Sequence, residues 1–347
     1  MNANLSHVIL MKNPITFHKA AWAACALLAL SACSDWTETE SIQLVENGIE
    51  QQQGAAYAKY LENLKNYKSS DHKLVFGWFD NSEKNPYTRG QHLADVPDSL
   101  DIVVVSAPQL TDEELSEVDQ LHEKGTKVYF TINFDQIKKT YEERVKEGVE
   151  TADFSTVLQS EVSATIALEQ PFDGLVVAYR GSSPIYLSAA EKAEVEKHQQ
   201  LLLSAVQQWH QAHTDKKLAF YGYPAHLTTL ASLLASCEQI VLVTDNVGDK
   251  QQLGIEAKQA LFNSQVPADR FIFTVSTVSL DTTDKNTGYM GTDRATSEAA
   301  YWMTQPAQGF TKMGLSILNI QNDYYNATNT YHYVREAIQI MNPAPAK

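Results

Sequence analysis

The sequence predicts an α/β protein of the (β/α)8 TIM barrel class. From Lys73 onward, short apolar runs alternate with longer segments of helical period, which is typical of repeated βα units around a parallel sheet. Eight such runs occur, and eight strands with their helices match the usual length of this barrel, ~250 residues. A doubly wound open sheet is the alternative, but the Gly-rich first turn that often marks it is missing after the first run.

The predicted strands share β-branched and aromatic residues, and most of them end at polar or turn-forming residues. They are residues 73–79, 101–107, 126–134 and 172–179 in the first half, and 217–223, 238–245, 270–277 and 312–320 in the second. Each is short enough for a strand buried on both faces.

Segments of helical period between these runs predict the outer layer. Thr111 and Glu114 form a capping box ahead of one helix, which Gly125 ends. The predicted helices also include 188–213, 227–237 and, last in the ring, 330–341. Apolar and tyrosine side chains recur every three or four residues in 53–68, which predicts a further helix beneath or beside the barrel.

The N-terminal residues predict a targeting segment. Basic residues precede the apolar stretch 20–33, which is too short to span a bilayer as a mature helix. It ends in Leu30-Ser31-Ala32-Cys33, which resembles the bacterial lipobox. This resemblance implies that the signal peptide 1–32 is removed and that Cys33 carries lipid. Residues 33–50 are predicted to be a flexible acidic tether, similar to the surface-export signal of Bacteroidetes lipoproteins, and 51–347 to be one barrel domain.

Charge and composition narrow the possible functions. The formal net charge is -15 and there is no basic run, which argues against nucleic-acid binding. Histidines are scattered without a metal-binding spacing, and no motif predicts a cofactor or a nucleophile paired with histidine. Cys25 leaves with the signal peptide, so Cys237 is the one cysteine left for the fold. It is expected to be a small buried residue.

In a barrel of this class, residues at the carboxyl ends of the strands form the active site. Aromatic and amide side chains dominate those positions and suit a carbohydrate, because rings stack on sugar C–H faces and amides bind hydroxyls. A strand-end Trp equally suits core packing, and strand-end carboxylates equally suit loop capping. The candidate ligand-binding residues are Trp78, Asp80, Asn133, Tyr179, Arg180, Tyr221, Tyr223, Asp245, Asn319, Gln321 and Tyr324.

The fourth predicted strand carries the most informative motif. Its sequence FDGLVVAYR resembles D-G-x-D-x-D-x-E, the fourth-strand motif of glycoside hydrolase family 18, which contains chitinases and endo-β-N-acetylglucosaminidases. Asp173 and Gly174 match the motif, and the resemblance covers roughly residues 73–341. Val176, Ala178 and Arg180 stand where the family has two aspartates and the terminal glutamate.

The resemblance implies a sugar-binding cleft without its hydrolytic groups. In the family the glutamate protonates the glycosidic oxygen, and the neighbouring aspartate orients the acetamido group that acts as nucleophile. Arg180 cannot replace that acid, because a guanidinium stays protonated at any useful pH. Val176 and Ala178 carry no polar atom with which to orient a substrate.

Three functions remain open. The first is a non-catalytic, lipid-anchored glycan-binding protein at the outer-membrane surface, which binds N-acetylglucosamine-containing oligosaccharides for a glycan importer and its hydrolases. The second is a glycosidase with displaced carboxylates, with Asp245 as acid and Asp135 or Asp323 as base. The third is a scaffold lipoprotein whose barrel mouth binds a protein.

Overall fold

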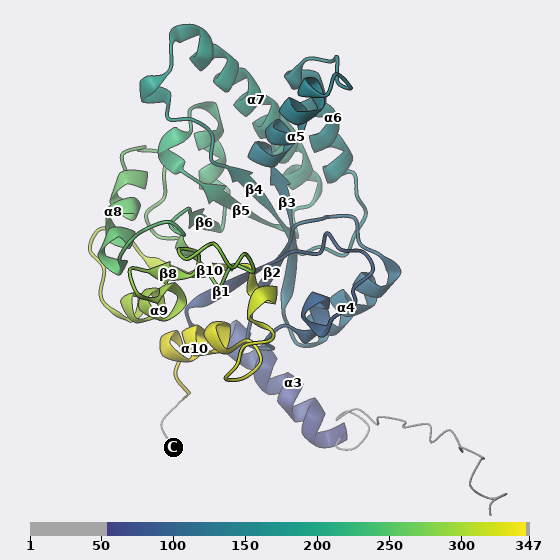
Figure 1. Cartoon of the computed structure of the whole chain (residues 1–347), viewed down its shortest axis with the longest axis vertical. Coiled ribbons are helices and arrows are strands. Elements are labelled where there is room, and N and C mark those ends of the chain that lie inside the picture. The colour runs from purple at the N-terminus through teal and green to yellow at the C-terminus, as the bar shows by residue number, and fades with distance from the viewer. Residues whose placement is uncertain (1–53, 345–347) are drawn as a thin grey trace, which may run out of the picture. The chain divides into compact units, whose positions relative to one another are not determined.

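Eight parallel strands close into a barrel in the computed structural model of the chain, which describes residues 54–344 (Figure 1). Around the ring the strands follow the order β1-β10-β7-β6-β5-β4-β3-β2. Their bounds are β1 Leu74–Phe79, β2 Ile102–Val105, β3 Lys127–Asn133, β4 Gly174–Tyr179, β5 Lys217–Gly222, β6 Gln239–Leu242, β7 Phe271–Ser276 and β10 Lys312–Leu318. The predicted (β/α)8 barrel is confirmed. The predictions for residues 1–53 lie outside the described residues.

Alternation along the strands creates two separate cores, since successive side chains point to opposite faces of a sheet. One core fills the barrel interior and contains Phe76, Tyr129, Val176, Ala178 and Tyr221. The larger core lies between the strands and the outer layer. The side a residue faces therefore decides whether it can reach the barrel mouth.

Helices cover the outside of the barrel, as Figure 1 shows. They are α3 Gly54–Ser69, α4 Asp112–Glu123, α5 Phe134–Lys146, α6 Phe154–Ile166, α7 Ala189–Ala212, α8 Lys250–Ala260, α9 Ala295–Thr304 and α10 His332–Met341. The capping box predicted at Thr111 and Glu114 is present at the start of α4. Between β7 and α9 lies a short antiparallel pair, β8 Tyr289–Met290 and β9 Asp293–Arg294.

Two strands are not followed by an α-helix, contrary to the predicted pattern. Only the 3₁₀ turns η1 Arg89–Gln91 and η2 Leu93–Asp95 follow β1, and η4 Pro224–His226 and η5 Thr229–Ala235 follow β5. The segment 227–237 was predicted to be α-helical. The Gln199 side chain on α7 holds the start of this segment, because its Oε1 accepts hydrogen bonds from the N–H groups of Thr228 and Leu230.

The predicted helix at 53–68 is α3, and it contacts the base of the barrel. Lys68 on α3 hydrogen-bonds Thr126, which lies just before β3. Asn342, just after α10, donates to the Tyr67 hydroxyl at 3.1 Å and also accepts from the backbone N–H of Lys73, just before β1. Among residues 54–344, no helix is both long and apolar enough to cross a membrane.

Candidate functional site

The mouth of the barrel is built from inward-facing side chains at the carboxyl ends of the strands. Trp78 on β1 and Tyr221 on β5 pack against each other with ring centroids 4.8 Å apart. Arg180 follows β4 and contacts Tyr221, while Asp245 follows β6 and contacts Arg180. Tyr223, two residues after Tyr221, borders the same interior core. Five of the predicted residues therefore lie together.

Arg180 lies at the centre of this group. One of its terminal nitrogens, Nη2, donates to the Tyr221 hydroxyl at 2.6 Å and lies 3.9 Å from Asp245 Oδ1. Its side chain is 44% exposed, so the guanidinium stays accessible from the mouth. Burial lowers the pKa of Arg180, but Tyr221, Asp245 and Tyr223 outweigh burial and raise that pKa above its ordinary value. Arg180 is therefore a permanent cation.

The backbone around Arg180 is fixed from two sides. Asp135 accepts hydrogen bonds from the N–H groups of Arg180 at 2.7 Å and Gly181 at 3.1 Å. The His226 ring nitrogen Nδ1 donates to the carbonyl of Arg180 at 2.7 Å. These contacts hold the loop after β4 in place, and they already engage both carboxylate oxygens of Asp135.

Trp78 faces the barrel interior and has a defined orientation. Its indole Nε1 donates to Ser316 Oγ on β10 at 2.7 Å, and its ring borders the interior core. The side chain is partly buried, so part of the ring remains open at the mouth. A ring held by both a hydrogen bond and packing can stack on a ligand at little further entropic cost.

The degenerate motif divides into a structural part and a mouth part. Asp173 lies before β4, where it accepts from His122 at 2.9 Å and from the N–H of Val128 at 2.8 Å. A Cβ atom on Gly174 would lie 2.7 Å from the carbonyl oxygen of Lys217, so this position requires glycine. The two residues that match the family motif therefore support the barrel.

The three replaced positions of the motif all point inward. Val176 and Ala178 are buried in the interior core, at 0% and 2% exposure, and present only carbon to the barrel axis. Arg180, two residues further along, reaches Tyr221. The spacing of two carries all three side chains to one face, as alternation along a strand requires.

Tyr179 does not belong to the mouth, and its predicted ligand-binding role is wrong. Alternation turns it outward, where it is 1% exposed in the outer core. Its ring lies 4.7 Å from Phe134, and its hydroxyl accepts from Gln199. Tyr324 also packs against the outer core, with its ring 5.3 Å from that of Tyr331, so it does not line the barrel interior.

Several remaining candidates hold their own loops. Asp80 accepts from the N–H of Ser82, and Asn133 accepts from the N–H of Gln136 as the cap of α5. Asn319 adopts a left-handed backbone and donates to Ser276 Oγ at 2.9 Å. Gln321 has a buried Oε1 that lacks a hydrogen bond among the described residues. Of these four side chains, only Gln321 keeps an unused buried acceptor.

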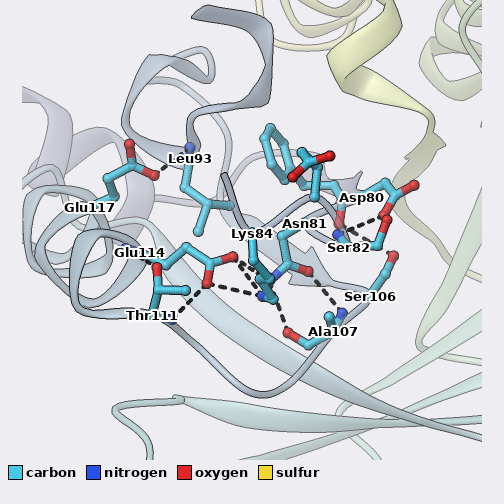
Figure 2. Close-up of polar contacts among 12 residues, drawn as sticks. Asp80, Asn81, Ser82, Lys84, Leu93, Ser106, Ala107, Thr111, Glu114 and Glu117 are labelled. Carbon is cyan, nitrogen blue, oxygen red and sulfur yellow. Dashed lines mark hydrogen bonds and ion pairs between the residues drawn. The ribbon is translucent and has the colours of Figure 1, made fainter. Parts of the chain in front are cut away.

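Figure 2 shows the polar contacts that fix the loop after β1. The buried Asn81 side chain donates to the carbonyl of Ala107 and accepts from the N–H of the same residue, each at 2.8 Å. Asn81 and Lys84 also donate to the Glu114 carboxylate on α4. The sequence revealed the capping role of Glu114 but gave no sign of these contacts between loops.

Within residues 54–344, one group of side chains has the composition of a metal site. His92, Glu113 and Glu117 bring one nitrogen or oxygen each within 4.8 Å of the others. His92 Nδ1 lies 2.6 Å from Glu117 Oε1, and Glu117 Oε2 accepts from the N–H of Leu93. This ion pair already explains the arrangement, because it joins η2 to α4.

The structure excludes Asp323, one of the two candidate bases in the hypothesis of a glycosidase with displaced carboxylates. Asp323 is 1% exposed, and it accepts from the N–H of Val334 at 3.0 Å and from the Asn326 side chain at 2.8 Å. It therefore caps α10 and cannot contact a ligand. Asp245 remains in the mouth, and its Oδ1 is buried without a hydrogen bond among the described residues.

The closed parallel barrel, with an aromatic and charged mouth at the carboxyl ends of its strands, defines a protein of the (β/α)8 barrel class, in which the site lies at those strand ends. A family model described as glycoside hydrolase family 18, BT1044-like, matches residues 37–340. The chain therefore belongs to glycoside hydrolase family 18.

Two solved structures resemble the chain in fold. An endo-β-N-acetylglucosaminidase from Cordyceps militaris, in its apo form, is 19% identical, covers 82% of this chain and 96% of its own, and has a TM-score of 0.58. A selenomethionine variant of BT1044 is 17% identical, with coverage of 85% and 95% and a TM-score of 0.57. No curated protein matches the chain. At these identities the likeness concerns the fold alone.

Proposed function

We propose that this protein binds N-acetylglucosamine-containing oligosaccharides of the N-glycan type without cleaving them. Membership of family 18 supports a glycan as the ligand class. The proposal depends above all on Arg180, which stands at the motif position of the family's general acid and has no proton to donate. Loss of general acid catalysis alone typically slows a reaction ~10²–10⁴-fold.

The residues inside the mouth give a second reason to expect no hydrolysis. Substrate-assisted cleavage needs a polar group that orients the acetamido oxygen, and Val176 and Ala178 offer only carbon. Binding has no such requirement, because ring stacking and hydroxyl hydrogen bonds do not need a proton donor. Trp78, Tyr221, Tyr223, Arg180 and Asp245 can provide both kinds of contact.

The decisive experiment combines binding with turnover. The soluble chain beginning after Cys33 is applied to an array of chitin oligosaccharides and N-glycans, and each glycan that binds is then incubated with the protein overnight. We expect binding without product. Product that forms with the wild-type protein and disappears with Asp245→Asn would overturn the proposal and establish a glycosidase that uses the remaining carboxylate of the mouth.

We further propose that the protein is anchored by lipid on Cys33 at the outer-membrane surface, where it delivers glycan to an importer and to active hydrolases. The small residues before Cys33 support this proposal. A single acyl chain contributes ~0.8 kcal/mol per buried CH₂ and binds a membrane only marginally. Stable anchoring therefore requires the several acyl chains of a lipoprotein cysteine. Full recovery of Cys33→Ala in the membrane fraction would contradict the anchor.

A further inference from the structure

A cavity lies beside the mouth, with Tyr223 among its lining residues. It measures about 320 Å³ and is bounded by the residues that follow β5, by the end of β6 and by α8. That volume falls at the lower end of ligand pockets, ~300–1,000 Å³. Leu242, Val243 and Ala260 give it an apolar floor, whereas Glu256 and His226 bring polar groups to it.

Two residues connect this cavity with the mouth. Tyr223 lines the cavity, and the charges of Arg180, Asp245 and Glu256 all act on its phenol. His226 also lines the cavity, and its Nδ1 donates to the Arg180 carbonyl. Tyr223 and His226 therefore border the cavity and also interact with Arg180 at the mouth.

Two of the polar side chains that line the cavity, Glu256 and His226, offer free acceptors. Glu256 forms no hydrogen bond or ion pair among the described residues, and burial raises the pKa of its carboxyl group. His226 Nδ1 must carry the proton that it donates to a carbonyl, so Nε2 of the neutral ring has a free lone pair. These two acceptors can bind ligand groups that donate hydrogen bonds, such as hydroxyl groups. The Glu256 carboxylate repels anionic ligands.

We propose that this cavity binds a second, neutral sugar unit that branches from the oligosaccharide held in the mouth. The inference rests on the proposed glycan-binding function and adds a specificity to it, namely for branched neutral glycans over linear ones and over those whose branch carries a carboxylate or sulfate. The apolar floor packs against the C–H face of the sugar, and Glu256 and His226 accept from its hydroxyl groups.

The test compares a linear and a branched ligand. Chitotriose serves as the linear probe and the trimannosyl chitobiose core as the branched one, with binding measured by titration calorimetry. Gln259→Trp blocks the cavity from its exposed rim, and Glu256→Ala removes an acceptor. Lys258→Trp is the matched control, because Lys258 is exposed on the same helix and does not line the cavity.

We expect Gln259→Trp and Glu256→Ala to weaken binding of the branched probe by about tenfold and to leave the linear probe within about twofold of wild type. Lys258→Trp should bind both probes like the wild type. Unchanged affinity of both cavity variants for the branched probe overturns the cavity as a subsite while the proposed function stands. If the wild-type protein binds neither probe, the proposed function fails as well.

Discussion

The Arg180 guanidinium donates a hydrogen bond of 2.6 Å to the hydroxyl of Tyr221, on the neighbouring strand β5. This contact joins the replaced acid position of the family motif to the aromatic lining of the mouth, because the Tyr221 ring also packs on Trp78. Asp135 and His226 fix the backbone beneath it. The cation is thus an integrated part of the mouth.

Arg180→Glu is expected not to restore hydrolysis. The substitution would remove the hydrogen bond that the Arg180 guanidinium donates to Tyr221 and would place a second carboxyl group near Asp245, and Ala178 would still offer no group to orient an acetamido oxygen. Overnight release of product from a bound glycan is the measurement, with Arg180→Gln as control. Turnover by the glutamate variant, absent from the glutamine variant, would show that hydrolysis is missing only because the general acid is missing.

Gln199→Leu is expected to lower the free energy of unfolding by about 2–4 kcal/mol, because it leaves buried backbone donors unpaired. Gln199 is fully buried, and its Oε1 accepts from the N–H groups of Thr228 and Leu230 while its Nε2 donates to the Tyr179 hydroxyl. Urea denaturation measures the change. Gln200→Leu is the control, since Gln200 is exposed on the same helix and should shift stability little.

A stability that decreases with rising pH is expected from His72. Its Nε2 faces Asp101 Oδ1 and its Nδ1 faces the Ser70 carbonyl, each at 2.8 Å, so both ring nitrogens donate and the imidazolium form is favoured. The hydrogen bond to Asp101 raises the pKa of His72 above 6.5. The stabilisation is fully present below the unfolded value, ~6.5, and is lost as pH rises through the raised folded value.

Thermal unfolding of the wild type and of His72→Gln across this pH range isolates the contribution. The difference in midpoint between the two proteins should be largest in mild acid and should shrink above neutrality. The hydrogen bond to Asp173 raises the pKa of His122 as well. His122 is present in both proteins, so it does not contribute to the difference between them. A difference that grows with pH would contradict the assignment of His72 as an imidazolium.

The barrel could be predicted from the sequence because its strands are continuous apolar runs, and alternation then carries Val176, Ala178 and Arg180 to one face. The same alternation excludes Tyr179, which the sequence prediction placed in the mouth because of its position at a strand end. Cys237 is fully buried as expected, and burial raises the pKa of its thiol to about 12.

Other parts of the site depend on contacts that the sequence pattern does not reveal. Glu256 lies on α8 and His226 in a 3₁₀ turn, and only the closed ring brings them to one cavity. Asn81 binds the loop after β2 across 26 residues of sequence. Strand periodicity describes neither helices nor turns at the mouth, so these residues could not be found before the fold was known.

Trp78→Ala is expected to weaken glycan binding by about tenfold, which corresponds to ~1.4 kcal/mol, without any effect on turnover. The indole borders the interior core beside Tyr221 and is oriented by its hydrogen bond to Ser316, so its loss removes a stacking surface at the mouth. Ser316→Ala is the matched control, because it removes the hydrogen bond and keeps the ring, and it should reduce affinity far less. Calorimetry with a glycan identified on the array measures both variants. Equal affinity of Trp78→Ala and the wild type would place the ligand outside the barrel mouth.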